Sequence, residues 1–128
     1  PLYDTISIIN SEKTIFLQPF TPNEVITLIL KTTRKTTPGI DNIDGRALKA
    51  VAVALAEPLC YFINESFEKG VFPNSLKHSK CVPIFKKGGS KFNKSDYRSV
   101  CIQSQIGKVL EAAFLERLTI FLEKNNLL

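Results

Sequence analysis

The sequence predicts an α+β fold, in which helices are followed by an antiparallel β-hairpin and a C-terminal helix. Apolar residues recur at helical spacing between positions 25 and 67, and again between 106 and 122. Between these stretches lie two β-type runs, KCVPIF and YRSVCIQ, about a dozen residues apart. With 128 residues, 44% of them hydrophobic, the chain can form one domain with its own core.

The first predicted helix begins at the sequence TPNE, after an irregular lead-in over residues 1–20. Thr21 is the expected N-cap, Pro22 suits the first helical position, and Glu24 completes a capping box with Thr21. We expect one domain portion over residues 21–128, and the first helix ends before Pro38.

A second helical stretch follows, with Asp44 as its expected N-cap and a break or kink at Pro58. Gly70 stands where a helix-ending glycine is typical. In the last helix, the spacing places Leu110 and Phe114 on the buried face.

Positive charge is concentrated on the predicted hairpin. Between Lys77 and Arg98 lie seven basic residues and a single acidic one, whereas the whole chain has a net charge of +5. A solvated lysine face is one interpretation, and a surface for phosphates is the other, which this concentration favours. Gly88 and Gly89 suit either close approach of a ligand or an ordinary turn. Arg98 either grips phosphate with its planar fork or forms an ion pair with Asp96 or a glutamate.

The cysteines and the single histidine do not predict a metal site. Cys60, Cys81 and Cys101 form no CxxC pair, and we expect reduced core thiols in an intracellular protein. If the two strands pair symmetrically, however, Cys81 lies opposite Cys101 and a disulfide is the alternative. We expect no signal peptide, because the first ten residues have neither a basic segment nor a long apolar one. No apolar stretch in the sequence is long enough for a membrane span, so we also expect no membrane partner.

From Phe20 onward the sequence resembles the reverse transcriptases of non-LTR (LINE-like) retrotransposons. The resemblance rests on a PGID loop, GVFP, PIFKKG, DYR and GKVLE, which occur in order and at suitable spacing. It implies the N-terminal and fingers part of a right-hand polymerase. The sequence departs from the family after the DYR motif, where Ser99 replaces the usual proline, and after Asp41, where Asn42 replaces the usual glycine.

The resemblance also implies roles for individual residues. Lys86 or Lys87 takes the family's lysine position and Arg98 its arginine position, where they contact the triphosphate of the incoming nucleotide. The loop containing Pro38, Gly39 and Asp41 corresponds to a motif that lies against the template. The remaining expected nucleic-acid contacts come from the hairpin lysines, namely Lys80, Lys91 and Lys94.

The same resemblance implies which partners and metal ions to expect. The partners are an RNA template, a DNA primer, deoxynucleotide triphosphates and a palm domain. Polymerisation requires metal ions held by carboxylates, which the family supplies from palm motifs further along than Leu128. We therefore expect no catalytic residue and no bound Mg²⁺ in these 128 residues. The chain begins at Pro1 and has no methionine, which suggests a fragment.

Three hypotheses remain open at this stage. The chain is a non-catalytic piece of a reverse transcriptase, a stand-alone nucleic-acid-binding module, or a remnant of a truncated element without function.

Overall fold

The computed structural model describes residues 15–32 and 37–127. Its four helices are α1 (Pro22–Thr32), α2 (Gly45–Ala50), α3 (Ala52–Lys69) and α4 (Gln105–Lys124). Strands β1 (Lys80–Phe85) and β2 (Tyr97–Ile102) form an antiparallel hairpin, preceded by the 3₁₀ turn η1 (Asn74–Leu76) and interrupted by η2 (Lys94–Asp96). The predicted α+β class and the order of elements are confirmed.

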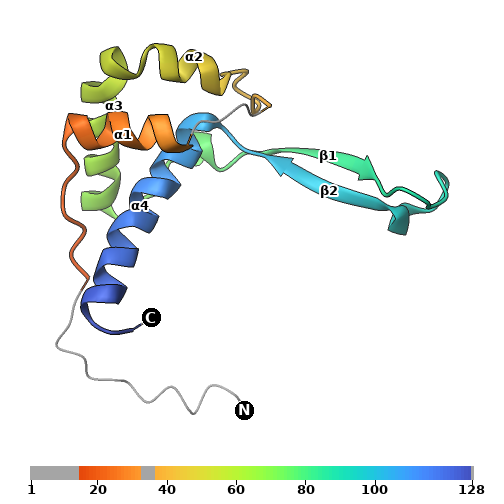
Figure 1. The fold of residues 1–128 in the computed structure, drawn as a ribbon. Coiled ribbons are helices and arrows are strands. Elements are labelled where there is room, and N and C mark those ends of the chain that lie inside the picture. Colours follow the sequence, from red (N-terminus) through yellow and green to blue (C-terminus); the bar gives the residue numbers. More distant parts are fainter. Residues whose placement is uncertain (1–14, 33–36, 128) are drawn as a thin grey trace.

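The helices form a body from which the hairpin projects, as Figure 1 shows. Helix α1 packs against α3 and α4, while the strands mainly contact each other. Residues from α1, α3 and α4 make most of the core, in which the most deeply buried large side chains include Ile29, Ile63 and Val109. Neither strand contributes a buried residue.

The N-terminus of α1 carries the predicted capping box. Glu24 Oε2 accepts hydrogen bonds from the backbone N–H of Thr21 at 2.8 Å and from its hydroxyl at 3.0 Å. The Thr21 hydroxyl oxygen in turn accepts the Glu24 N–H at 3.4 Å. The backbone bond from Thr21 lowers the pKa of Glu24 despite partial burial, and Arg117 lowers it further.

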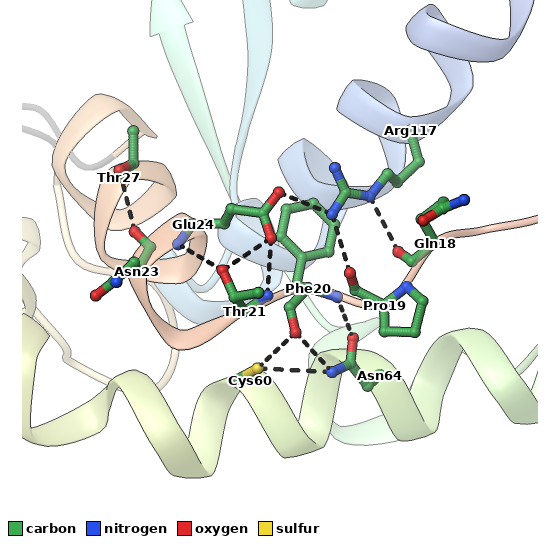
Figure 2. Close-up of polar contacts among 10 residues, drawn as sticks. All are labelled: Gln18, Pro19, Phe20, Thr21, Asn23, Glu24, Thr27, Cys60, Asn64 and Arg117. Carbon is green, nitrogen blue, oxygen red and sulfur yellow. Dashed lines mark hydrogen bonds and ion pairs between the residues drawn. The ribbon is translucent and has the colours of Figure 1, made fainter.

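The last residues of the lead-in are tied to the helical body (Figure 2). Phe20 is 3% exposed, and its backbone N–H and C=O both bond to the side chain of Asn64, at 2.7 and 3.0 Å. The Arg117 guanidinium lies 3.8 Å from the centre of the Phe20 ring and donates to the carbonyls of Gln18 and Pro19. Positions 1–14 of the predicted lead-in lie outside the described residues.

Of the two outcomes expected at Pro58, the break is wrong, and the kink stays a prediction. The interruption lies at Val51, between α2 and α3, and α3 continues through Pro58 as one helix. Proline removes one helical hydrogen bond and crowds the preceding turn. The burial of Leu59 and Ile63 beyond it against the other helices offsets that local cost. The predicted N-cap at Asp44 and the glycine terminator at Gly70, with φ +62°, are confirmed.

Helix α4 is buried only in its first half. Its N-cap is Ser104, and Leu110 is buried as predicted, at 2% exposure. Phe114 is not: its side chain is 45% exposed, and its ring meets the edge of Phe67 with centroids 6.4 Å apart. The helix extends past the core after Ala113, so helical spacing there no longer corresponds to burial.

Candidate nucleic-acid interface

The strand register determines which hairpin residues share a face. Lys80 pairs with Ile102 and Phe85 with Tyr97, one to one and without a bulge. Proline in a strand predicts either an edge position or a bulge. Pro83 lies at an edge, because a two-stranded sheet has only edge strands. Since side chains alternate across a strand, Lys80, Lys86 and Arg98 fall on one face.

The apolar residues of this same face remain accessible. Ile84, which pairs with Arg98, is 50% exposed, and Val100 is 41% exposed. Alternation places both on the face that bears Lys80, Lys86 and Arg98. We call these five residues the basic face. Both the charges and the apolar surface between them can therefore contact a ligand.

The cysteines lie on the opposite face. Cys81 pairs with Cys101, as the symmetric register predicts, and Phe85 and Tyr97 lie on that face with ring centroids 5.4 Å apart. The expectation of core thiols holds for Cys60, which is buried, but it is wrong for Cys81 and Cys101, which are exposed. They are exposed because the hairpin projects from the body, so that none of the described helices covers this face.

The hairpin loop between the strands is closed by Asp96. Its carboxylate accepts the Ser90 N–H at 2.9 Å, and its side-chain carbons lie so close to Gly89 that an added Cβ would be 2.6 Å away. Gly88 has a φ of +93°, a conformation that other residues rarely adopt. The turn therefore explains Gly88 and Gly89 without a ligand, which is the second of the two interpretations given for them.

Arg98 does not form the ion pair with Asp96 that the sequence left open. Within residues 15–32 and 37–127 its guanidinium has no hydrogen-bond or ion-pair partner, and the side chain is exposed. Lys86 differs, because its ammonium donates to the Ser95 carbonyl at 2.6 Å. That neutral partner orients Lys86 and leaves its charge uncompensated.

The other hairpin lysines are equally accessible. Lys87, Lys91 and Lys94 lie in or beside the loop between the strands, and Lys80 begins β1. All four are exposed, and no hydrogen bond or ion pair of their ammonium groups occurs in the described part of the chain. Uncompensated positive charge therefore extends from the base of the hairpin to its tip.

The loop containing Pro38, Gly39 and Asp41 lies at the base of the hairpin. A Cβ on Gly39 would lie 2.8 Å from the carbonyl oxygen of Gln103, just past the end of β2. Asp41 accepts the Ile43 N–H at 3.2 Å, which stabilises the turn. Arg98 lies five residues before Gln103, or about 17 Å away along β2. The structure thus places this loop beside the Lys80 end of the basic face and away from Arg98 and Lys86.

One candidate residue escaped the sequence analysis. Phe92 is 100% exposed at the hairpin tip, between Lys91 and Lys94. An exposed aromatic ring among lysines is the arrangement on which unpaired bases stack. The available signal was an aromatic residue interleaved with basic ones, KFNK.

Two negative observations apply to the described residues. No group of three or more His, Cys, Asp or Glu side chains is arranged to hold a metal ion within residues 15–32 and 37–127. In the same part of the chain, no helix combines the length and apolar character needed to cross a membrane.

Comparison with known proteins identifies relatives for most of the chain. No protein-family model matches it. A putative 115 kDa protein in the type-1 retrotransposable element R1DM of Drosophila melanogaster is 34% identical over 95 residues, or 73% of this chain. The RNA-directed DNA polymerase from mobile element jockey of the same organism is 29% identical over 102 residues, or 80% of the chain. A probable RNA-directed DNA polymerase from transposon BS, also from Drosophila melanogaster, is 26% identical over 112 residues, or 88% of the chain.

The matches cover only a small part of each relative. The aligned residues amount to 9% of the R1DM protein, 11% of the jockey polymerase and 12% of the BS protein. The comparisons bear out the resemblance that the motifs indicated. Over most of its length, the chain is homologous to a segment of the RNA-directed DNA polymerases of non-LTR retrotransposons.

Proposed function

We propose that this chain acts as part of a reverse transcriptase, where its hairpin binds the phosphates of the RNA template, the DNA primer and the incoming deoxynucleotide triphosphate. The observation that carries the proposal is the basic face, which presents Lys80, Lys86 and an unpaired Arg98 on one side of a projecting hairpin. The homology to RNA-directed DNA polymerases supports nucleic acid as the partner.

Arg98 is suited to the triphosphate because of its geometry. Its guanidinium can donate two parallel hydrogen bonds to one phosphate group. The regular strand fixes its backbone, and no acidic side chain in the described residues competes for it. Lys86, on the same face and near the same end, would supply the lysine contact, while Lys87 adds charge from the turn.

The loop at the base of the hairpin would meet a different part of the ligand. The contact of Gly39 with the backbone at Gln103 holds the Pro38–Asp41 loop beside the Lys80 end of the basic face. A nucleic-acid strand lying along the hairpin would then touch this loop and Lys80 with one section and Arg98 with another. Exposed Phe92 offers a ring for an unpaired base.

The chemistry of polymerisation does not belong to these residues in our proposal. Two metal ions stabilise the attacking and leaving oxygens of phosphoryl transfer, and they need several carboxylates together. The described carboxylates form no such group, so the residues present do not fit Mg²⁺. Asp41 stabilises a turn and Asp44 caps α2. We propose that the chain binds without catalysing and relies on a palm domain for catalysis.

The salt dependence of RNA binding tests the proposal. The probe is a fluorescein-labelled single-stranded RNA, and anisotropy gives its affinity over a range of salt concentrations. Each neutralised phosphate contributes about −0.7 to the log–log slope on a single strand. Lys86→Ala together with Lys87→Ala should therefore flatten the slope by up to about 1.4. Arg98→Lys keeps its charge and should leave the slope nearly unchanged.

The control variant removes the same charge from the helical body. Lys31 and Lys49 lie in the last turns of α1 and α2. Replacing both with alanine should flatten the slope less than the hairpin pair does. If the wild type and the Lys86/Lys87 variant bind equally with equal slopes, the hairpin charge is only a solvated face and the proposal is wrong.

A further inference from the structure

We propose that Cys81 and Cys101 form a reversible disulfide across the base of the hairpin, with glutathione disulfide as the oxidant. The bond would clasp the two strands where they leave the helical body. This inference rests on the geometry of the hairpin alone and does not require that the hairpin bind nucleic acid.

The hydrogen-bond pattern places the two cysteines at a non-hydrogen-bonded strand pair, where opposite side chains lie closer together. The Lys86 N–H donates to the Asp96 carbonyl at 2.7 Å, so this pair is a hydrogen-bonded one. Hydrogen-bonded and non-hydrogen-bonded pairs alternate along an antiparallel ladder. Counting back from Lys86, Cys81 and Cys101 form a non-hydrogen-bonded pair. Pro83, which has no N–H to donate, falls at the same type of pair, as this count requires.

The separation within such a pair fits a disulfide without rearrangement of the strands. Cα atoms in a non-hydrogen-bonded pair are about 4.5 Å apart, and a disulfide accepts roughly 4.4–6.8 Å. The two sulfur atoms are already in contact, at 2.7 Å, with both thiols free. They must approach by about 0.7 Å to reach the bonded distance, which small side-chain rotations supply.

The exposure of the three cysteines separates this pair from the remaining thiol. Cys81 and Cys101 are exposed, whereas Cys60 is buried and its thiol donates to the Phe20 carbonyl at 3.0 Å. Burial raises the pKa of Cys60, which reduces its thiolate fraction. An oxidant in solution therefore reaches the hairpin pair and not the core thiol.

The reaction proceeds by two thiol–disulfide exchanges. The thiolate of one hairpin cysteine attacks a sulfur of glutathione disulfide, forming a mixed disulfide and releasing one glutathione thiolate. The second cysteine, as its thiolate, attacks the protein sulfur of that mixed disulfide and releases the second glutathione thiolate. The two protons from the cysteines protonate the two glutathiones, so the cysteines are oxidised and glutathione disulfide is reduced. The hydrogen bond with Cys81 raises the pKa of Cys101, so the reaction should accelerate at mildly alkaline pH.

The disulfide would change the hairpin without covering its basic face. It lies on the face opposite to Lys80, Lys86 and Arg98, and it closes the whole loop that carries the hairpin tip. Cross-linking removes conformations from the opened state of such a loop. The strands should therefore separate less often in the oxidised protein than in the reduced one.

Incubation with glutathione disulfide, followed by thiol counting and peptide mapping, tests the proposal. The purified 128-residue chain should fall from three titratable thiols to one in denaturant. Trypsin should release CVPIFK cross-linked to SVCIQSQIGK, the peptides that contain Cys81 and Cys101. In hydrogen exchange, the amides of β1 and β2 should exchange at least about tenfold more slowly after oxidation.

The control keeps the number of thiols but moves one to the other face. In the variant Cys81→Ser with Val82→Cys, the new cysteine pairs with Val100 and points away from Cys101. This variant should accumulate mixed disulfides with glutathione and no internal bond. The proposal is overturned if the wild type instead accumulates stable glutathione adducts or disulfide-linked dimers, or if it forms the internal bond no faster than the control.

Discussion

The helical body and the hairpin divide two physical tasks within one short chain. Helices α1, α3 and α4 supply most of the buried core, whereas β1 and β2 bury no residue. Conversely, the segment from Lys77 to Arg98 contains seven basic residues and one acidic residue, which gives it a net charge of +6. The net charge of the whole chain is +5, so all of the excess positive charge lies in this segment. Stability therefore resides mainly in the body, and the charge available to a partner resides in the hairpin.

This division has a physical cause. Clustered positive charges repel one another and need hydration, so they cannot be placed against an apolar core without a large desolvation cost. A projecting hairpin leaves them in water, and its two strands satisfy each other's backbone groups. Substitutions in the body should therefore change folding, while substitutions in the hairpin should change binding.

The largest effect should follow truncation in the body. Ile63 on α3 is 1% exposed within the core, so Ile63→Ala removes apolar contacts and leaves a cavity. We expect a loss of about 2–5 kcal/mol in the free energy of unfolding, measured by urea denaturation. Val53, on the exposed side of the same helix at 78%, is the matched control. Val53→Ala should change the stability by less than about 0.5 kcal/mol, and equal losses at both positions would contradict the assigned core.

A smaller effect, dependent on pH, should come from the junction of α1 with the lead-in. Glu24 accepts the Thr21 N–H and forms an ion pair with Arg117 at 3.0 Å, and its pKa lies below the ordinary value of 4.5. Glu24→Gln keeps a capping acceptor but removes the charge. We expect a loss of about 1 kcal/mol at pH 7, after allowing for the partial exposure of the carboxylate.

The sign of the pH dependence follows from the lowered pKa. The ionised Glu24 stabilises the fold fully above its unfolded pKa, and this contribution disappears as the pH falls through the lower folded value. Urea denaturation at several pH values should therefore show the two proteins converging in acid. The control is Glu65→Gln, because Glu65 pairs with Lys69 on the surface of α3. At pH 7 its free energy of unfolding should differ from that of the wild type by less than that of Glu24→Gln does. If the free energies of unfolding of Glu24→Gln and wild type differ by the same amount down to pH 2, the stabilisation does not come from the charge of Glu24.

The features predictable from the sequence are those with local causes. Caps at Thr21, Asp44 and Gly70 depend on hydrogen bonds between neighbouring residues, and all three are confirmed. The hairpin follows from two β-type runs in the sequence. A symmetric register of these runs predicts Cys81 opposite Cys101, and the structure has this register. Strand alternation could also have grouped Lys80, Lys86 and Arg98 on one face.

The errors concern features set by distant parts of the chain. Whether Phe114 is buried depends on where α4 leaves the core, and the continuity of α3 through Pro58 depends on packing against other helices. The contact of Arg117 with Phe20 joins residues far apart in sequence, so spacing gives no sign of it. The sequence also does not determine the partner of Asp96, because its carboxylate can reach either Arg98 or the backbone of the hairpin loop. In the structure it accepts a hydrogen bond from the Ser90 N–H of that loop.

The smallest effect on stability should come from the hairpin itself. Ile84 is 50% exposed on the basic face, and threonine retains the branched side chain that suits a strand. Ile84→Thr should therefore change the free energy of unfolding by less than about 0.5 kcal/mol in urea denaturation. Because Ile84 pairs with Arg98, the same change should weaken RNA binding if the apolar surface beside the arginine contacts the ligand. A loss of stability well above about 1 kcal/mol would instead show that the hairpin contributes to the folding of the body, and the division between the two regions would then be wrong.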